Sequence, residues 1–251
     1  MKNTIIFDNK VDFKQGETLT FFLNENLDFK VENKIFSAQT LSKIQVYLKN
    51  LKFKKNKKKI ISFDVSEKNK ILFIIVREKL VSNNFEELGA NFYSIIKTNK
   101  IDKVNLYADT LKYFKFYKKN TKLILNFVHG FNLKSYFFDK YKTQNKNIFY
   151  FSLKIISSEK KSLNNNYFRY KAIESGVFQT RDLVSEPPNI LYPKKYIEVI
   201  KKLSSLGLKI KIYNESKMKK LGMYALLGVG QGSINESFMV TMEWKGNKKS
   251  K

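Results

Sequence analysis

The stretch "RDLVSEPPNILYP" (residues 181–193) contains all three prolines of a chain of 251 residues. A proline disfavours the helical conformation of the residue before it, so Pro187 and Pro188 together must end any helix that reaches this point. Pro193 suits the first turn of a following helix, because a backbone N–H would have no intrahelical partner there. The stretch therefore predicts a structural elbow at which one helix passes into the next.

The segments on both sides of the elbow carry the expected patterns. Upstream, apolar residues recur at helical spacing over 167–185, which predicts a helix that ends at the prolines. Downstream, "KKYIEVIKKLSSL" (194–206) predicts a second helix, which Gly207 closes. The further elements that we expect in this second α/β unit are a strand at 208–213, a short capped helix at 214–222, and strands near 225–229 and 238–244.

The first two thirds of the chain alternate between strand and helix patterns. The expected strands are 59–65, 70–78, 103–108 and 147–153, and the expected helices are 84–98 and 121–139. Strands that alternate with helices require parallel crossovers, so the predicted fold class is α/β with a layered sheet. The polar stretch "SSEKKSLNNN" (157–166) interrupts the alternation and predicts a domain boundary, which divides the chain into residues 1–160 and 161–251.

Composition limits the class of protein. Hydrophobic residues make up 43% of the sequence, which is ample for the core of one large domain or two modest ones. The chain has no cysteine, which excludes disulfides and zinc–thiolate sites. The N-terminal "MKNTIIFDNKVDF" lacks the apolar core of a signal peptide, and lysines interrupt every apolar run before it reaches the roughly 18 residues of a membrane span. We therefore expect a soluble cytoplasmic protein without a membrane partner.

The formal net charge of +26 would attract polyanions at low salt. The basic residues, however, are 45 lysines and only 3 arginines, and they are spread along the whole chain. Proteins that read nucleic acid usually favour arginine, whose planar fork makes paired hydrogen bonds. A solvated lysine-rich surface is therefore the first interpretation, and weak, salt-sensitive binding of nucleic acid is the second. The densest run, "KFKKNKKK" (52–59), is interpreted as a charged loop.

The residue types that most often carry chemistry do not form a recognisable active site. The glycine-rich "GVGQGS" (228–233) lacks the Lys-Ser/Thr ending of a P-loop and is interpreted as a tight turn that permits close packing. His129 is the sole histidine and lies in an apolar segment, so it is interpreted as a packed side chain. The carboxylates weighed as acid–base or metal-binding groups follow no known ligand spacing: Glu86, Glu87, Glu174, Asp182 and Glu186. The predicted set of catalytic, metal-binding and substrate-binding residues is therefore empty.

Three segments, in their order and spacing, resemble the beginning of the catalytic domain of the leucyl (cytosol) aminopeptidase family. They are "TRDLVSEPPNILYP" (180–193), "KLGMYALLGVGQGS" (220–233) and "SFMVTMEWKG" (237–246). Upstream, "GFNLKSYFFDKYKT" (130–143) is similar to the helix at the end of that family's N-terminal domain. Tyr224 departs from the resemblance, because a small residue is usual at that position.

The resemblance implies both a fold and a function. Members of the family are homo-hexameric exopeptidases that remove N-terminal residues, leucine among them, from peptide substrates by means of two divalent metals (zinc, manganese or magnesium). Their N-terminal domain is a three-layer, macro-domain-like α/β sandwich. Their metal ligands and assisting basic residues lie in a "GKG…FD" segment, an aspartate-rich helix and an "NTDAEGR" segment, and none of these motifs occurs in this sequence.

We therefore expect this chain to be the N-terminal domain and the incomplete beginning of the catalytic domain of such an enzyme, ending before the metal-binding motifs. Alone it is expected to bind no metal cofactor and to hydrolyse no peptide. Apolar side chains of the second unit, such as Leu226, Leu227 and Trp244, are then expected to lack much of their covering layer. The alternative, from a different class, is a basic α/β module that binds nucleic acid without catalysis.

Overall fold

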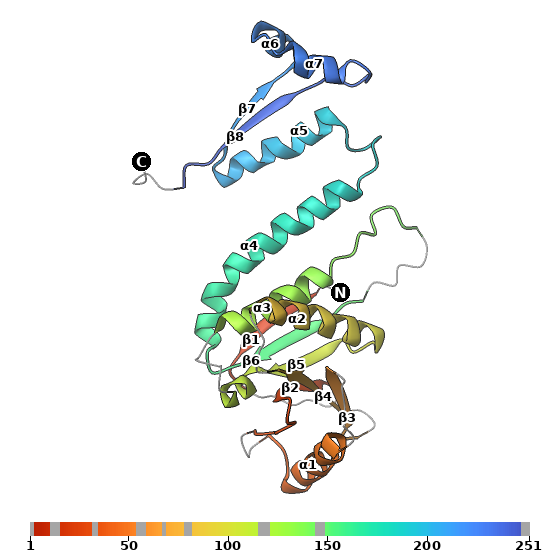
Figure 1. The fold of residues 1–251 in the computed structure, drawn as a ribbon, viewed down its shortest axis with the longest axis vertical. Coiled ribbons are helices and arrows are strands. Elements are labelled where there is room, and N and C mark those ends of the chain that lie inside the picture. The colour runs from red at the N-terminus through yellow and green to blue at the C-terminus, as the bar shows by residue number, and fades with distance from the viewer. Residues whose placement is uncertain are drawn as a thin grey trace. The chain divides into compact units, whose positions relative to one another are not determined.

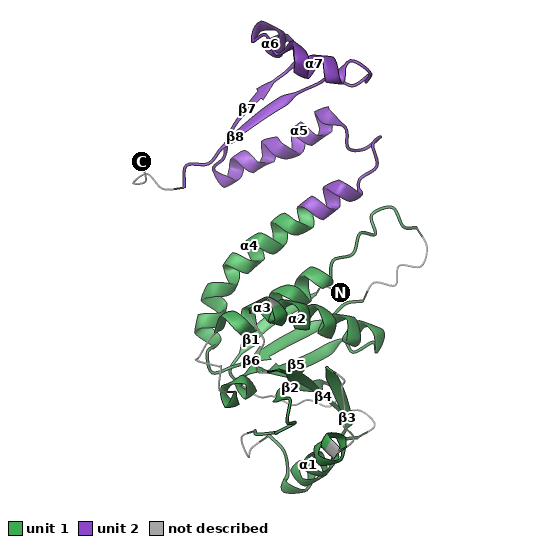
Figure 2. Cartoon of the chain, in the orientation of Figure 1, with its two compact units in different colours: residues 1–179 green, residues 180–251 purple. Residues whose placement is uncertain are grey.

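The computed structural model (Figure 1) describes residues 3–10, 16–31, 35–53, 59–66, 69–77, 82–114, 121–143 and 149–246. Contacts between Cα atoms divide the chain into two compact units, which we call unit 1 (residues 1–179) and unit 2 (residues 180–251) (Figure 2). Residues 54–58 of the predicted charged loop lie outside the described residues. No described helix combines the length and the hydropathy needed to cross a membrane.

Unit 1 is built on a six-stranded sheet. Its strands are β1 (Thr4–Asp8), β2 (Thr18–Asn24), β3 (Ile60–Asp64), β4 (Lys70–Val76), β5 (Lys103–Tyr107) and β6 (Ser152–Ile156). The order across the sheet is β1-β6-β5-β2-β4-β3 (Figure 1). The β3–β4 pair is antiparallel and the other pairs are parallel. The mostly parallel sheet confirms the predicted α/β class.

Helices cover both faces of this sheet (Figure 1). They are α1 (Ala38–Phe53), α2 (Ser82–Thr98), α3 (Thr121–Lys134) and the first part of α4 (Lys160–Ser185), with a 3-10 helix at Ala108–Tyr113. One core joins the sheet to α1 through residues such as Phe21 and Ile44. The other core joins the opposite face to α2, α3 and α4 through residues such as Phe22, Phe127 and Leu163. Unit 1 is therefore a three-layer α/β sandwich.

Strand β2 shows how the sequence produces this sandwich. Leu19, Phe21 and Leu23 belong to the core beside α1, whereas Phe22 belongs to the core beside α2 and α3. All four side chains are buried. A strand that is covered on both faces needs apolar residues at successive positions, because neighbouring side chains point to opposite faces.

Thr20, also on β2, is fully buried, and its hydroxyl has no hydrogen-bond partner among the described residues. A buried hydroxyl without a partner costs about 1–3 kcal/mol. Thr20→Val keeps the shape and removes the hydroxyl, so we expect it to raise the free energy of unfolding by about 1 kcal/mol. Urea denaturation followed by circular dichroism measures this change.

Thr110→Val is the matched control for that experiment. The Thr110 hydroxyl accepts from the backbone N–H of Phe22 (3.0 Å) and donates to the carbonyl of Tyr107 (2.9 Å), so its removal should lower the stability. If Thr20→Val were also destabilising, the Thr20 hydroxyl would have a partner in solution, and our interpretation of it would be wrong.

Most predicted elements of unit 1 are present, with two changes of extent. The predicted helix at 121–139 ends early, because the hydroxyl and the backbone N–H of Ser135 both donate to the carbonyl of Asn132 (2.7 and 3.0 Å) and close α3 at Lys134. The strand predicted at 147–153 is shifted along the chain, because β6 spans Ser152–Ile156. Residues 147 and 148 lie outside the described residues. Three elements before residue 59, namely β1, β2 and α1, are absent from the prediction.

The polar stretch 157–166, predicted as a domain boundary, lies in unit 1, and its residues 160–166 form the beginning of α4. Leu163 is fully buried in the core, so the helical part of the stretch presents this one apolar side chain to the sheet while its polar residues are exposed or half-buried. The division between the two compact units falls further along the same helix, between residues 179 and 180, rather than between 160 and 161.

Unit 2 contains a two-stranded antiparallel sheet and short helices. After the end of α4 the elements are α5 (Pro193–Lys202), a 3-10 helix at Leu203–Leu206, β7 (Lys209–Tyr213), α6 (Glu215–Lys220), α7 (Tyr224–Gly230) and β8 (Met239–Glu243). The predicted caps are confirmed. Asn214 accepts from the backbone N–H of Lys217 (3.1 Å) at the start of α6, and Gly207 has the left-handed φ of 93° after the 3-10 helix.

The prediction of a strand near 225–229 is wrong, because these residues belong to helix α7. The error has a physical reason: a short apolar run has the same composition in a buried strand and in a buried helical turn. In the structure Leu227 is buried while Leu226 and Val229 are exposed, which is the one-sided burial of a helix on a surface. The expectation of poor covering therefore holds for Leu226 and does not hold for Leu227.

Candidate functional site

The elbow between α4 and α5 has the predicted form. Helix α4 ends at Ser185, and Pro193 is the first residue of α5. Between them, the carbonyl of Pro187 accepts from the backbone N–H groups of Ile190 and Leu191, each at 2.9 Å. These bonds turn the chain tightly after the two prolines, so that α5 folds back beside the end of α4.

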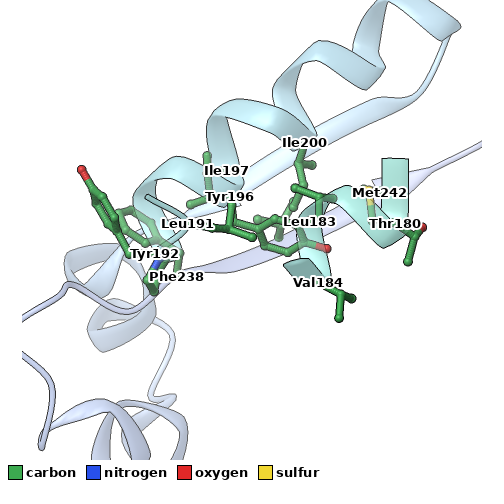
Figure 3. Close-up of a pocket in the computed structure, with 12 residues that line it drawn as sticks. Thr180, Leu183, Val184, Leu191, Tyr192, Tyr196, Ile197, Ile200, Phe238 and Met242 are labelled. Atoms are coloured by element: carbon green, nitrogen blue, oxygen red, sulfur yellow. The ribbon is translucent and has the colours of Figure 1, made fainter. Parts of the chain in front are cut away.

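An apolar groove of about 680 Å³ lies within unit 2, around this elbow. The last turns of α4 contribute Leu183 and Val184, and α5 contributes Tyr196, Ile197 and Ile200. Thr180 of α4 also lines the groove, and the remaining lining comes from the end of the elbow and from the strand β8 with the residue before it. Figure 3 shows Leu183, Tyr196 and Ile200 close together, with Val184 directed away from them. The groove is thus assembled from segments on either side of the prolines.

The groove offers an apolar surface rather than a reactive one. Among the described residues that line it, none carries a charge, and the polar atoms of the lining side chains are hydroxyls of threonine and tyrosine. Ile197 and Ile200 at its floor are buried, whereas Val184 is 82% exposed and Met242 is 53% exposed. An apolar surface that is only half covered is suited to contact with another apolar surface.

The β7–β8 sheet extends this apolar surface. Ile210 pairs with Met242 and Ile212 pairs with Val240, so these four side chains share one face, and Lys209 and Lys211 share the other. Just beyond β8, Trp244 is 64% exposed. No other described strand pairs with the second edge of β8, which therefore presents unpaired backbone groups.

The glycine-rich segment 228–233 lies at the end of α7 and allows a close approach of the chain. Gly228 and Gly230 end helix α7. A Cβ added at Gly230 would overlap the Ser237 hydroxyl, so this glycine permits the close packing that the sequence suggested. The backbone N–H of Ser237 in turn donates to the carboxylate of Glu215 (2.9 Å). Glu215 thus anchors the loop before β8, and Gly230 leaves room for Ser237 beside it.

His129 and Glu174, which the sequence presented as unrelated candidates, form a buried pair in unit 1. His129 Nδ1 lies 2.9 Å from Glu174 Oε1, and the Asn132 amide donates to Glu174 Oε2 at 2.6 Å. The Tyr167 hydroxyl donates to the same oxygen at 3.3 Å. Because 45 positions separate His129 from Glu174, no local spacing in the sequence could reveal the pair. The interpretation of His129 as a packed side chain agrees with its burial.

The other candidate carboxylates do not gather into a site. Glu87 is exposed and forms an ion pair with Lys59 (3.3 Å), and its neighbour Glu86 is half-buried. Asp182 and Glu186 belong to unit 2, whereas Glu174 belongs to unit 1. Across the described ranges, no three His, Cys, Asp or Glu side chains are grouped so as to hold a metal ion.

Comparison with known proteins gives a consistent match for unit 2. The family model described as "Cytosol aminopeptidase family, catalytic domain" matches residues 178–251. The match begins within two residues of the point where unit 2 begins.

Curated relatives extend the similarity upstream. The chain is 39% identical over 150 residues to the "Probable cytosol aminopeptidase" of Phytoplasma mali, an alignment that covers 58% of this chain and 29% of the relative. It is 38% identical over 176 residues to the protein of the same name from Rickettsia rickettsii (strain Sheila Smith), which covers 68% of this chain and 35% of the relative. The chain thus spans about a third of the length of these relatives.

Solved structures share the fold. A mutant tomato leucine aminopeptidase superposes with a TM-score of 0.75 at 18% identity, over 96% of this chain and 50% of the other. The bottromycin maturation enzyme BotP, in complex with Mn, superposes with a TM-score of 0.64 at 14% identity, over 92% and 45%. The similarity covers nearly all of this chain and about half of each of the other two.

Proposed function

We propose that this chain, which matches the cytosol aminopeptidase family over part of its length, is the N-terminal domain and the beginning of the catalytic domain of a metalloaminopeptidase. In this proposal the part of unit 1 before α4 is the N-terminal domain, α4 is the linking helix that continues from unit 1 into unit 2, and the segment from the elbow onward belongs to the catalytic domain. The observation that carries the proposal is the coincidence of two boundaries: the catalytic-domain match starts at residue 178, and unit 2 starts at residue 180.

The two units differ in how far their apolar side chains are buried, and this difference supports the division. Unit 1 has a helix layer on each face of its sheet and two extensive buried cores. The buried apolar side chains of unit 2 that are described are Ile197, Ile200, Met218 and Leu227. A sheet of two strands is at most marginally stable without further covering. Unit 2 is therefore suited to be part of a larger layered domain.

We assign the apolar groove as the surface on which the rest of that catalytic domain packs. The alignments cover only 29% and 35% of the curated relatives, so most of the length of these proteins lies outside the matched region. The second edge of β8 offers backbone groups for another strand, and the face of Val240 and Met242 offers apolar contacts for the same polypeptide. Burial of the groove would contribute about 25 cal/mol per Å² of apolar surface removed from water.

The proposed activity belongs to the whole protein. We propose that it removes N-terminal residues such as leucine from peptides in the cytoplasm, as a homo-hexamer with two divalent metals (zinc, manganese or magnesium). Such metals polarise a carbonyl group and make a bound water nucleophilic. The residues described here do not fit this metal pair, because Glu174 already accepts three hydrogen bonds in a buried position and the other candidate carboxylates are scattered. The proposal therefore assigns the ligands to the remainder of the catalytic domain.

The test is a chimera in which residues 1–251 are followed by the part of the Rickettsia rickettsii relative that lies beyond the matched region. We expect the folded chimera to hydrolyse leucine p-nitroanilide when manganese is added, and we expect the 251-residue chain alone to show no hydrolysis. Both proteins are purified from a host strain that lacks its own aminopeptidases. A folded chimera without activity, or metal-dependent hydrolysis by the chain alone, would contradict the proposal.

Trp244 reports separately on the groove. It is the sole tryptophan of the chain and is 64% exposed, so its emission in the chain alone should be that of a solvated indole. In a chimera whose added part has its tryptophans replaced by phenylalanine, we expect the emission to shift to the blue and acrylamide quenching to weaken. Unchanged quenching in a folded chimera would show that the added part does not cover this surface.

A further inference from the structure

Helix α4 packs on unit 1 through a stripe of four residues: Leu163, Tyr167, Tyr170 and Glu174. Successive members are four, three and four positions apart, which places them on one face of the helix. The stripe is apolar or aromatic up to its last member. Glu174 is a carboxylate where the pattern calls for an apolar residue, and yet it is 2% exposed.

Three polar side chains contact the Glu174 carboxylate and allow it to remain buried. Its two oxygens meet His129 Nδ1 (2.9 Å), the Asn132 amide (2.6 Å) and the Tyr167 hydroxyl (3.3 Å). Because a carboxylate only accepts hydrogen bonds, Nδ1 of His129 is a donor here. Burial raises the pKa of the Tyr167 phenol, and the charge of Glu174 raises it further, so this hydroxyl stays protonated and donates.

The rest of the stripe selects the position of α4 along α3 less strongly than a buried charge does. Tyr167 and Tyr170 are about one helical turn apart. If α4 moved by one turn along its axis, the ring of one tyrosine would come close to the position that the other had occupied. The ring of Tyr170 contacts His129 (5.2 Å between centroids) and its hydroxyl donates to Asn126 Oδ1 (2.7 Å). A slide would, however, separate Glu174 from His129 and leave a buried charge without partners, which is strongly unfavourable.

We propose that the Glu174–His129 pair is a register lock that selects one position of α4 on α3. A polar group at a single buried position is known to specify the register of packed helices at some cost in stability. The role matters for this chain because α4 is continuous into unit 2 and carries the first residues of the groove. The lock operates within unit 1, independently of any catalytic activity.

The test compares Glu174→Leu, His129→Phe and the double variant in the 251-residue chain. Glu174→Leu leaves His129 buried without its carboxylate partner, and His129→Phe leaves the buried Glu174 with only the Asn132 and Tyr167 donors, so we expect the amides of residues 163–177 to exchange about 100-fold faster than in the wild type. The double variant buries two apolar groups instead and takes an acceptor only from the Asn132 amide and the Tyr167 hydroxyl, so it should recover protection to within about tenfold. Gln179→Leu, at an exposed position of the same helix, is the control and should leave exchange unchanged.

Two ring contacts report the register itself. Phe7 lies 5.2 Å from Tyr167, and Tyr136 lies 5.4 Å from Phe178, between ring centroids. We expect the wild type to give one set of nuclear Overhauser contacts for both pairs. The double variant should lose them or give several sets, although its α4 remains helical and protected. A double variant that keeps both contacts as a single set would overturn the proposal, as would single variants with unchanged exchange.

Glu174→Gln keeps the experiment decisive if the larger changes prevent folding. Glutamine retains an acceptor for His129 and fits the same space, but it has no charge and brings its own N–H donors towards Asn132 and Tyr167. We expect both ring contacts to persist and the amides of residues 163–177 to exchange about tenfold faster. Exchange that matches the wild type would show that the charge plays no part in holding α4, which contradicts the register lock.

Discussion

Gly130→Ala is expected to lower the free energy of unfolding by about 3 kcal/mol. Helices α2 and α3 approach each other through two glycines. A Cβ added at Gly130 would overlap the carbonyl oxygen of Glu86, and a Cβ added at Gly89 would overlap the carbonyl oxygen of Phe127. Both obstacles are backbone atoms within helices, so neither can give way by a change of rotamer. The two helices must instead separate, which opens the core around Phe127 and Phe131.

The matched control is Gly176→Ala on helix α4. A Cβ at this exposed position would meet nothing within 4 Å, and alanine is favoured over glycine inside a helix by about 0.5–1 kcal/mol. This variant should therefore be slightly more stable than the wild type. Urea denaturation followed by circular dichroism measures the free energy of unfolding of both variants. Wild-type stability of Gly130→Ala would mean that α2 and α3 are not in such close contact.

The second large effect concerns unit 2 in the 251-residue chain. We expect the amides of β7 and β8 to exchange at least about 1,000-fold faster than those of β4, which corresponds to a difference of about 4 kcal/mol in opening free energy. Strand β4 is covered on both faces, and Ile71, Phe73 and Ile74 are fully buried. Strand β8 has three exposed residues out of five, and its partner β7 has none that is buried.

Hydrogen exchange measured by mass spectrometry decides this point, on protein shown to be monomeric by analytical ultracentrifugation. The monomer check is necessary because association through the apolar groove would itself protect unit 2. Equal protection of β4 and β8 in a monomer would mean that unit 2 is stable without further covering, and the proposal that it awaits the rest of a catalytic domain would lose its main physical support.

Local sequence patterns determined several features without reference to the rest of the molecule. The end of α4 and the start of α5 follow from the prolines at 187, 188 and 193, because each proline restricts its own backbone and that of the residue before it. The cap at Asn214 likewise depends only on neighbours three residues away. The α/β class follows from alternating strand and helix periods, and the family resemblance followed from motifs around the same elbow.

Tertiary structure alone decided the remaining features. Residues 225–229 form a helix rather than a strand because one face of this short apolar run packs against the rest of unit 2. Periodicity cannot distinguish a helix from a strand in so few residues. The compact unit extends past the polar stretch 157–166 because Leu163 finds a place in the core. The pairing of His129 with Glu174, and the groove that joins Val184 to Met242, bring together residues far apart in the chain. Such contacts depend on how helices and strands pack in three dimensions, which local spacing does not encode.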